Sequence, residues 1–243
     1  MKKIGFFQLN SCSGCMFAVL SSTIFLDLLK SADIRLFRLI SDVQTEDQFD
    51  VVFIEGGVTR NEEAALLRRL WTEGAKIITL GSCAVLGGIM SHSPNMHIDP
   101  VNKFVDPYAT LPGCPPPQQL LGNLLMSAID GIEFKLPEKN VCSECPFAQD
   151  QTYDVEITSL NALHPPKSCF LSEGILCLGP ITRAGCGARC IKGATPCDGC
   201  LGALDRNLPS ALANLFSVLK VSDSIREYAA IAFRYQKPEL KFK

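Results

Sequence analysis

The chain has 243 residues, of which 47% are hydrophobic and 20% are charged, and its formal net charge is −2. A chain of this size can bury one large core or two modest ones, and without a Lys/Arg surplus to neutralise phosphates we expect no nucleic-acid partner. No apolar stretch approaches the ~20 residues of a membrane span, and the first residues carry neither a twin arginine nor a secretory apolar region. We therefore expect a cytoplasmic protein with no membrane span.

Short apolar runs alternate with helical patterns through the first half of the chain. The runs predict strands at 4–9, 34–40, 51–54 and 76–80. Helical patterns follow at about 15–29, at 59–71 and from about 118. The second of these helices is expected to open with a capping box, Thr59-x-x-Glu62. Strands that alternate with helices predict an α/β fold built on a parallel, doubly wound sheet.

The second half of the chain has a different composition. From Pro137 the helical and strand periodicity fades and Cys, Gly and Pro become frequent, so metal binding would supply much of the folding free energy of this segment. We place the boundary near 135–141, which gives one domain at 1–138 and a loop-rich, cysteine-rich domain at 139–243. A helix is expected from Leu208 to about Tyr235, and the basic residues at 237–243 are interpreted as a solvated terminus.

The chain contains twelve cysteines, which fall into three sets of four. The first set is dispersed and consists of Cys12, Cys15, Cys83 and Cys114. The order of the other eight suggests one set of Cys142, Cys145, Cys169 and Cys177 and another of Cys186, Cys190, Cys197 and Cys200. Four thiolates are the ligand set of one cubane iron–sulfur cluster, so the three sets predict three clusters that form a path for electrons. Interleaved ligation, with one cysteine traded between the last two sets, stays open.

The predicted fold explains how the dispersed cysteines could meet. Cys12 and Cys15 follow the first strand and Cys83 follows the strand at 76–80, and loops after parallel strands emerge at one edge of the sheet. Cys114 lies in a proline-rich turn before a helix. A glycine stands within two residues of each of these cysteines, and glycine lets the backbone approach a bulky group closely.

Other uses of cysteine fit the sequence less well. Cys142-x2-Cys145 and Cys197-x2-Cys200 could form a zinc ribbon in an interaction protein with no redox role, but the first set would then have no function. Cys12-x2-Cys15 alone could be the redox pair of a thiol–disulfide oxidoreductase. A disulfide framework needs an oxidising compartment, which nothing in the sequence indicates. The glycine strings of the common nucleotide-binding loops are absent from the sequence, so we do not expect nucleotide binding.

Two groups of motifs resemble a known family. The string Cys177-Leu-Gly-Pro-Ile-Thr-Arg-Ala-Gly-Cys186-Gly-Ala-Arg-Cys190, with Pro196-Cys197-Asp-Gly-Cys200 after it, is similar to the small, electron-transferring subunit of nickel–iron hydrogenases. Cys12-x2-Cys15, Gly81-Ser-Cys83-Ala and Gly113-Cys114-Pro-Pro resemble the proximal-cluster motif of that family. The resemblance covers roughly residues 4–205. It is nearest to the cytoplasmic group, with the sulfhydrogenase delta subunit first and the small subunit of deazaflavin-non-reducing hydrogenases second.

The resemblance implies a flavodoxin-like first domain whose proximal 4Fe–4S cluster, on Cys12, Cys15, Cys83 and Cys114, lies beside the nickel–iron site of a partner large subunit. It assigns the medial cluster to Cys186, Cys190, Cys197 and Cys200 and the distal cluster to Cys142, Cys145, Cys169 and Cys177. The chain itself would hold no catalytic residue and no other cofactor. Electrons would pass to an iron–sulfur/flavin diaphorase subunit that reacts with NAD(P), or to another acceptor module such as a heterodisulfide reductase.

Differences within the family sharpen this expectation. The membrane-bound branch has His where this chain has Cys142, and it usually has Pro where this chain has Cys190, which implies three all-cysteine 4Fe–4S clusters here. The related subunit of respiratory complex I shares the first domain, but it uses adjacent cysteines at the first motif and has no cysteine-rich second domain. The separated Cys12 and Cys15 therefore favour the hydrogenase group.

Several polar residues lie near the expected sites. Glu55 follows a strand at the ligand edge, so it is expected either to contact a proton path or the large subunit, or to be a helix-facing or solvated carboxylate. Arg183 and Arg189 lie between cysteines and are expected either to raise a cluster's potential or to pair with an acid. The three histidines have no ligand spacing, so we do not expect them to bind metal. They are His92, His97 and His164.

Overall fold

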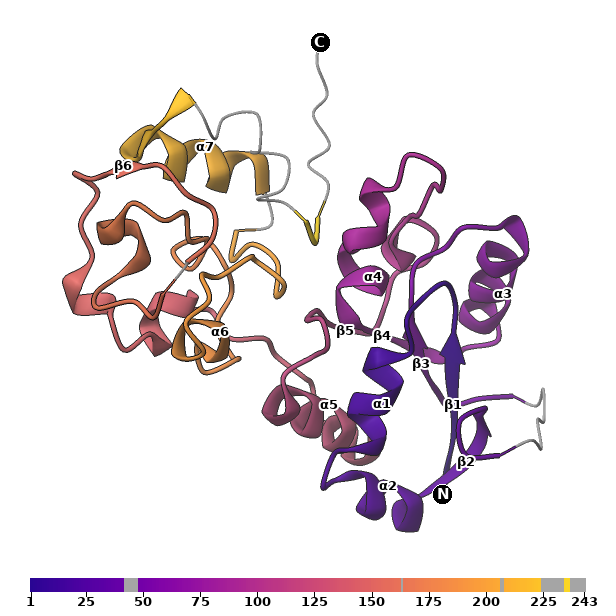
Figure 1. The fold of residues 1–243 in the computed structure, drawn as a ribbon. Helices are drawn as coiled ribbons and strands as arrows, with labels where there is room; N and C mark the ends of the chain where they lie inside the picture. Colours follow the sequence, from indigo (N-terminus) through magenta and orange to yellow (C-terminus); the bar gives the residue numbers. More distant parts are fainter. Residues whose placement is uncertain (42–47, 163, 206–207, 224–233, 237–243) are drawn as a thin grey trace. The chain divides into compact units, whose positions relative to one another are not determined.

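The computed structural model describes residues 1–41, 48–162, 164–205, 208–223 and 234–236, and it divides into two compact units, Met1–Leu136 and Pro137–Lys243 (Figure 1). The strands of the first unit are β1 (Lys2–Gln8), β2 (Ala32–Phe37), β3 (Val51–Glu55), β4 (Lys76–Leu80) and β5 (Ala109–Leu111). Its helices are α1 (Gly14–Leu20), α2 (Phe25–Ser31), α3 (Asn61–Thr72), α4 (Gly81–Leu86), η1 (Ile89–His92), η2 (Val101–Lys103) and α5 (Gln118–Asp130).

The five strands of the first unit form one parallel sheet in the order β2-β1-β3-β4-β5. This is the flavodoxin-like order, and it confirms the predicted parallel, doubly wound sheet. Four of the strands overlap the predicted apolar runs. The fifth, β5, has three residues and was not predicted, because so short a segment has no clear period of its own.

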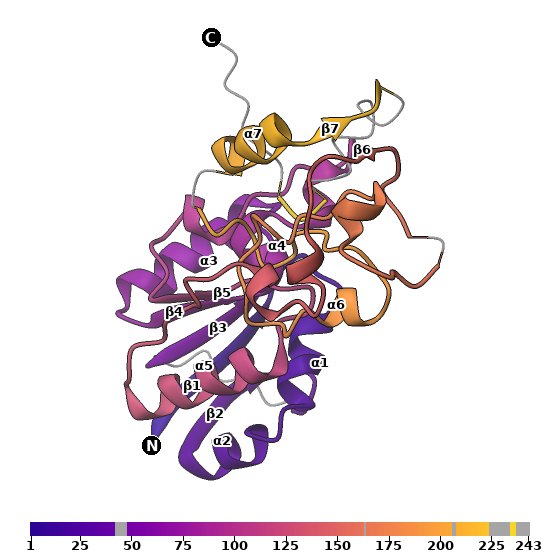
Figure 2. The same cartoon turned by 90° about the vertical axis from the view of Figure 1, so that its left-hand side faces the viewer.

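Helices cover both faces of the sheet, and each face has its own core (Figure 2). Helices α1, α2 and α5 pack on one face, whereas α3, α4 and η2 pack on the other. The central strand β3 is buried throughout, and its residues alternate between the two cores: Val51 and Phe53 face the first, and Val52 and Ile54 face the second. A strand that is buried on both faces reads as a continuous apolar run, which is the pattern seen here.

The predicted helix at 15–29 is wrong as a single element, because α1 and α2 meet at a bend of 76°. Serine side chains at the break take over backbone hydrogen bonds. Ser21 Oγ donates to the Phe17 carbonyl at 2.8 Å, and Ser22 Oγ accepts from the Ile24 N–H at 3.4 Å. Such local bonds compete with the helical pattern and end it. Within the described residues no single helix is long and apolar enough to span a membrane, and α1 and α2 meet that test only together, as this bent pair.

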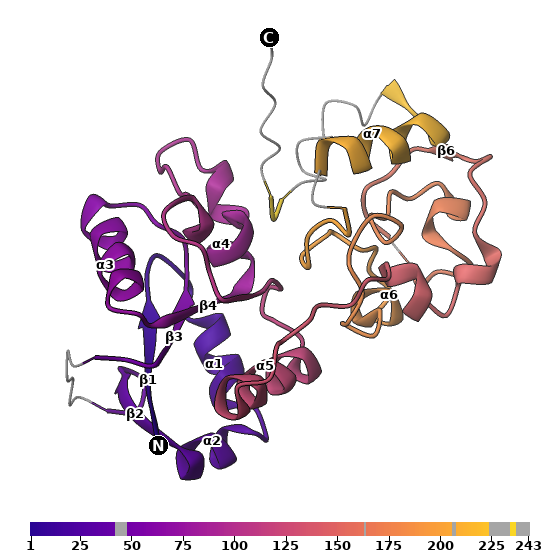
Figure 3. The same ribbon diagram turned by 180° about the vertical axis from the view of Figure 1, so that it is seen from behind.

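The second unit contains little regular structure. Its elements are η3 (Val141–Glu144), η4 (Ala148–Asp150), β6 (Glu156–Ile157), η5 (Phe170–Glu173), α6 (Arg189–Lys192), α7 (Leu208–Val218) and β7 (Lys220–Val221). Figure 3 shows α7 beside β6, which pairs with β7 in a two-stranded sheet. The predicted helix at 208–235 therefore ends at Val218, since the next residues enter a strand. Residues 224–233 of that prediction, and the basic tail at 237–243, lie outside the described residues.

The capping box of α3 is displaced by one residue from its predicted position. The structure makes Arg60 the N-cap and Glu63 its partner, and Glu62 is exposed. The Glu63 carboxylate accepts from the backbone N–H groups of Thr59 and Arg60 at 2.8 and 3.1 Å and pairs with the Arg60 guanidinium at 2.8 Å. Burial raises the pKa of Glu63, but these hydrogen bonds outweigh burial and hold the pKa below its usual value.

We expect Glu63→Ala to lower the free energy of unfolding by about 1–2 kcal/mol, because the two backbone N–H groups just before the helix lose their acceptor. Since the native pKa is lowered, the charge-dependent part of this contribution is present above pH ~4.3 and is lost as the pH falls through the native value. Urea unfolding of the anaerobic protein at pH 7 measures the effect. Glu62→Ala, in the exposed neighbouring carboxylate, is the control, and equal losses in the two variants would contradict the assignment.

Candidate functional site

The four cysteines of the first unit gather at the carboxyl edge of its sheet. Cys12 lies in the loop after β1, Cys15 in the first turn of α1, and Cys83 in the first turn of α4, directly after β4. Cys114 follows β5. Parallel strands end together at this edge, which is where open α/β sheets bind their ligands.

The thiols of this set are close enough to affect one another's ionisation. Burial, followed by the sulfurs of Cys114 and Cys12, raises the pKa of Cys83 to about 11. The pKa of Cys15 is raised well above its usual range, first by burial, then by Glu55 and by the other three cysteines. All four sulfurs therefore share one neighbourhood, in which a second negative charge is unfavourable unless a positive partner is bound.

Backbone hydrogen bonds hold two of the cysteine-bearing loops together. The Ser82 N–H donates to the Gly113 carbonyl at 3.0 Å, and the Gly113 N–H donates to Ser82 Oγ at 3.1 Å. This reciprocal pair joins the residue before Cys83 to the residue before Cys114. These bonds help to fix the distance between the two cysteines.

Two glycines leave room for the sulfurs. A Cβ atom on Gly81 would lie 2.3 Å from Cys15 Sγ, and one on Gly88 would lie 2.5 Å from Cys83 Sγ. Both glycines also have positive φ, +85° and +65°, which L side chains rarely adopt. Any other residue at these positions would displace a sulfur. The glycine at position 88 was not among those identified from the sequence.

Glu55 is a buried, helix-facing carboxylate. Its side chain is 1% exposed and accepts hydrogen bonds from the backbone N–H groups of Cys15 and Met16, both at 3.1 Å. Burial raises the pKa of Glu55, while the two N–H groups lower it. Of the alternatives expected for Glu55, the structure therefore agrees with a carboxylate that faces a helix, here α1. The sequence signal is a single carboxylate at the end of an otherwise apolar, buried strand.

In the second unit, four cysteines line one apolar pocket. They are Cys142, Cys145, Cys169 and Cys177. Burial and then the sulfurs of Cys177, Cys145 and Cys169 raise the pKa of Cys142 to about 12. The pocket therefore groups the first Cys-x2-Cys pair with Cys169 and Cys177, whereas a zinc ribbon would group it with the second such pair.

The remaining four cysteines form two pairs, Cys186 with Cys190 and Cys197 with Cys200. Burial and then the Cys186 sulfur raise the pKa of Cys190, and Asp198 contributes next. The pKa of Cys197 is raised by burial, then by Cys177, and to a smaller extent by Cys200. The Cys197 N–H also donates to Cys177 Sγ at 3.3 Å, so the two sets of the second unit touch each other.

Glu144 joins these two sets directly. It lies between Cys142 and Cys145 in the sequence, and its carboxylate accepts from the N–H groups of Gly185 and Gly187 at 3.0 and 2.8 Å. These two glycines flank Cys186. Glu144, which lies among the cysteines of the Cys142 set, thus holds the loop that carries Cys186 of the other set. Sequence analysis did not identify Glu144, because its partners are backbone groups about forty residues away.

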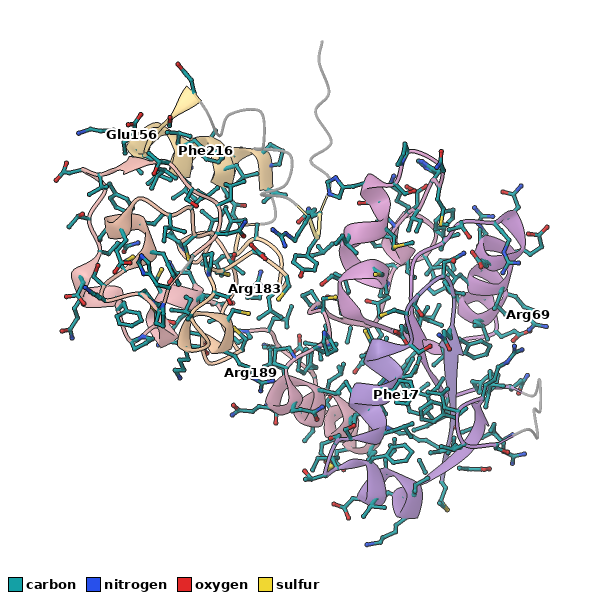
Figure 4. The ribbon with its side chains drawn as sticks, viewed as in Figure 1. Phe17, Arg69, Glu156, Arg183, Arg189 and Phe216 are labelled. Atoms are coloured by element: carbon teal, nitrogen blue, oxygen red, sulfur yellow. The ribbon has the colours of Figure 1, made fainter. Side chains whose placement is uncertain are left out.

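The two arginines between the cysteines differ in their contacts (Figure 4). The Arg183 guanidinium donates to the carbonyls of Pro137 and Leu204 at 2.7 and 3.0 Å, so it clamps backbone segments of the second unit. Arg189 lowers the pKa of Cys190, against the larger effects of burial and Cys186. Of the histidines, His97 pairs with Asp99 at 3.1 Å and His164 Nδ1 lies 3.4 Å from the Pro165 carbonyl.

The donor set fits iron–sulfur clusters. Thiolates are the ligands of 4Fe–4S clusters, and each binds a different iron of the cube. Among the described residues, no three His, Cys, Asp or Glu side chains converge on one point closely enough to hold a single ion. The pocket of Cys142 also contains a buried amide nitrogen, Gln151 Nε2, with no hydrogen-bond partner in the described part of the chain. A sulfur-rich group would supply the missing acceptor.

Comparisons with known proteins agree with the motifs. Residues 12–128 match the family described as the 20 kDa subunit of NADH ubiquinone oxidoreductase. The chain is 30% identical to a subunit of the vhu F420-non-reducing hydrogenase of Methanocaldococcus jannaschii, across 89% of this chain and 87% of that protein. It is 28% identical to the delta subunit of sulfhydrogenase 2 of Pyrococcus furiosus, across 90% and 92% of the two chains.

Among solved structures, a chain in the crystal structure of an NAD⁺-reducing NiFe hydrogenase in the H2-reduced state matches with a TM-score of 0.48 and 23% identity, over 56% of this chain and 95% of that one. The Methanocaldococcus relative is the more informative, because it is similar along nearly its whole length. From this relationship, the chain belongs to the family of hydrogenase small subunits.

Proposed function

We propose that this chain is the electron-transfer subunit of a cytoplasmic nickel–iron hydrogenase and relays electrons through three 4Fe–4S clusters. The electrons would pass between the nickel–iron site of a partner large subunit and a diaphorase-type NAD(P) subunit or another acceptor subunit. The observation that carries the proposal is the grouping of cysteines at two separate places, the sheet edge of the first unit and the apolar pocket of the second. When bound, the clusters would supply one-electron oxidation and reduction.

The ligand assignment follows the three sets. We assign the proximal cluster to Cys12, Cys15, Cys83 and Cys114, the medial cluster to Cys186, Cys190, Cys197 and Cys200, and the distal cluster to Cys142, Cys145, Cys169 and Cys177. We likewise assign the proximal cluster to a domain at 1–138 and the other two to a domain at 139–243.

Backbone amides of the second unit already point at ligand sulfurs. The Phe147 N–H donates to Cys145 Sγ at 3.4 Å, and the Cys197 N–H donates to Cys177 Sγ at 3.3 Å. Such N–H donors stabilise negative charge on a thiolate, so they favour the reduced form of a cluster and raise its potential. These two N–H groups therefore support the proposed relay, because they would stabilise the charge on the ligand sulfurs.

Apolar side chains lie exposed near the proposed proximal site. Phe17, labelled in Figure 4, lies on α1. It is 57% exposed, and Ile89, which begins η1 shortly after Cys83, is 50% exposed. Cys12 and Cys114 are exposed as well. An electron relay must dock closely onto the subunit that carries the catalytic metal, and exposed apolar groups favour such an interface. We therefore place the large-subunit interface around the Cys12 and Cys83 loops.

The first test is metal content. Anaerobically purified protein should be brown and should contain about twelve iron atoms and about twelve acid-labile sulfides per chain, because each cubane needs four of both. His164→Ala, in the second unit but not in a cysteine set, should leave both values unchanged. Stoichiometric zinc with negligible sulfide would contradict the proposal and would favour the zinc-stabilised interaction protein.

The second test concerns the medial set. Cys190→Pro should convert one cluster to the 3Fe–4S form, because three thiolates remain, and a new signal of the oxidised three-iron type should appear in electron paramagnetic resonance. Cys190 lies in the first turn of α6, where proline is tolerated. Cys190→Ala separates loss of the thiolate from any effect of the proline ring. If neither variant gave a three-iron signal while the other clusters stayed intact, Cys190 would not be a ligand.

The third test concerns the partner. Purification from the native organism should recover this chain with a large subunit that contains nickel, through an obligate interface of more than about 2,000 Å². Phe17→Asp should weaken this association, since it places a charge in the apolar contact, whereas Trp71→Asp on α3 should not. Recovery of the unmodified chain as a stable, iron-loaded monomer would argue strongly against the relay role.

A further inference from the structure

The side chain of Gln151 has an unusual environment in the second unit. It follows η4 and lines the pocket formed by the cysteines of the distal set. Its Nε2 atom is buried and makes no hydrogen bond within the described residues. A side-chain amide nitrogen carries two N–H donors, and buried donors in native proteins nearly always have an acceptor. The missing acceptor therefore requires an explanation.

The pocket itself offers few acceptors other than sulfur. Apart from the cysteines and Gln151, its lining is apolar: Phe147, Ala148, Phe170, Leu171, Pro180 and Ile191. Gln151 lies near enough to Cys142 to lower the pKa of that thiol, against the larger effects of burial and the neighbouring cysteines. Of the two ends of the amide, only the nitrogen can donate a hydrogen bond to sulfur, and this nitrogen is the buried atom.

The backbone on either side of Gln151 is fixed. Ser172 Oγ, from η5, donates to the Asp150 carbonyl at 2.5 Å and accepts from the Thr152 N–H at 2.8 Å. One serine hydroxyl thus bonds both neighbours of Gln151. These bonds hold the backbone of Gln151 at the pocket wall without any bond from its own side chain.

Cys142 also differs from its neighbours in the kind of donor that lies near it. Cys145 and Cys177 each accept a backbone N–H, from Phe147 and Cys197. Near Cys142, the donor is the Gln151 side chain, which is close enough to lower the pKa of the thiol although its Nε2 atom makes no hydrogen bond of good geometry within the described residues. A side-chain donor can be changed by substitution without disturbing the loop, whereas a backbone donor cannot.

We propose that the Gln151 amide donates a hydrogen bond to a sulfur of the cluster held by the Cys142 set, either the Cys142 thiolate or a sulfide beside it, and thereby raises the reduction potential of that cluster. This inference rests on the proposed function. A donor to sulfur stabilises the additional negative charge of the reduced state more than it stabilises the oxidised state. Gln151 is therefore a positioning and tuning residue for the distal step, and not a ligand.

The test is a redox titration of the anaerobic complex, followed by electron paramagnetic resonance. Gln151→Met keeps the length of the side chain but removes the donor. At a fixed potential, we expect the reduced-to-oxidised ratio of one cluster to fall by about tenfold, which corresponds to a midpoint lower by about 59 mV for a one-electron couple. The other two midpoints should not move. Thr152→Ala, in the exposed neighbour, is the matched control and should leave all three midpoints unchanged.

A second measurement detects the contact directly. Wild-type protein with ¹⁵N in its glutamine side chains should show a nitrogen hyperfine coupling to the reduced distal cluster, and Gln151→Met should lack it. Three intact clusters with unmoved midpoints, or no such coupling in the wild type, would overturn the inference while leaving the relay in place. Failure of the proposed function looks different, because the protein would then contain no iron and no sulfide to titrate.

Discussion

Thiolates that are crowded into an apolar space repel one another, and both units must hold their cysteines together against this repulsion. The raised pKa values of Cys15, Cys83 and Cys142 have the same leading cause, burial, and neighbouring sulfurs add to it. Sulfurs in that setting are stable as thiolates only around a positively charged centre. The scaffold must therefore hold the sulfurs close together before such a centre is bound, or form around the centre as it binds.

The two units meet this constraint in different ways. In the first unit, a five-stranded sheet with a core on each face places its strand ends, and the loops follow from that frame. Glu55 and the Ser82–Gly113 pair then adjust individual loops. The second unit has only two short strands and few helical turns among its described residues, so polar side chains replace a sheet there. Arg183 and Glu144 bind backbone groups that are distant in the sequence.

Much of this arrangement could be predicted from the sequence, because its causes are local. Apolar runs predicted four strands of the sheet, and the order of the cysteines suggested the four that line the pocket of the second unit. The assignment of cysteines to clusters stays a prediction. The errors lie where local and tertiary effects compete. Serines at positions 21 and 22 end a helix that its apolar pattern would continue, and pairing of β7 with β6 ends α7 early. Gln151 and Glu144 left no signal, since a single polar residue in a loop acquires its role only from partners that folding brings to it.

The hydrogen bonds between Glu144 and the loop around Cys186 have a consequence for oxidative damage. A carboxylate that belongs to one cysteine set but orders the backbone of the next makes the two sites a single mechanical unit. If oxidation of its cysteines disordered the η3 turn that carries Glu144, the N–H groups of the glycines beside Cys186 would lose their acceptor. Damage at one cysteine set would then disturb the backbone of the other, so the two sets of the second unit would be lost together.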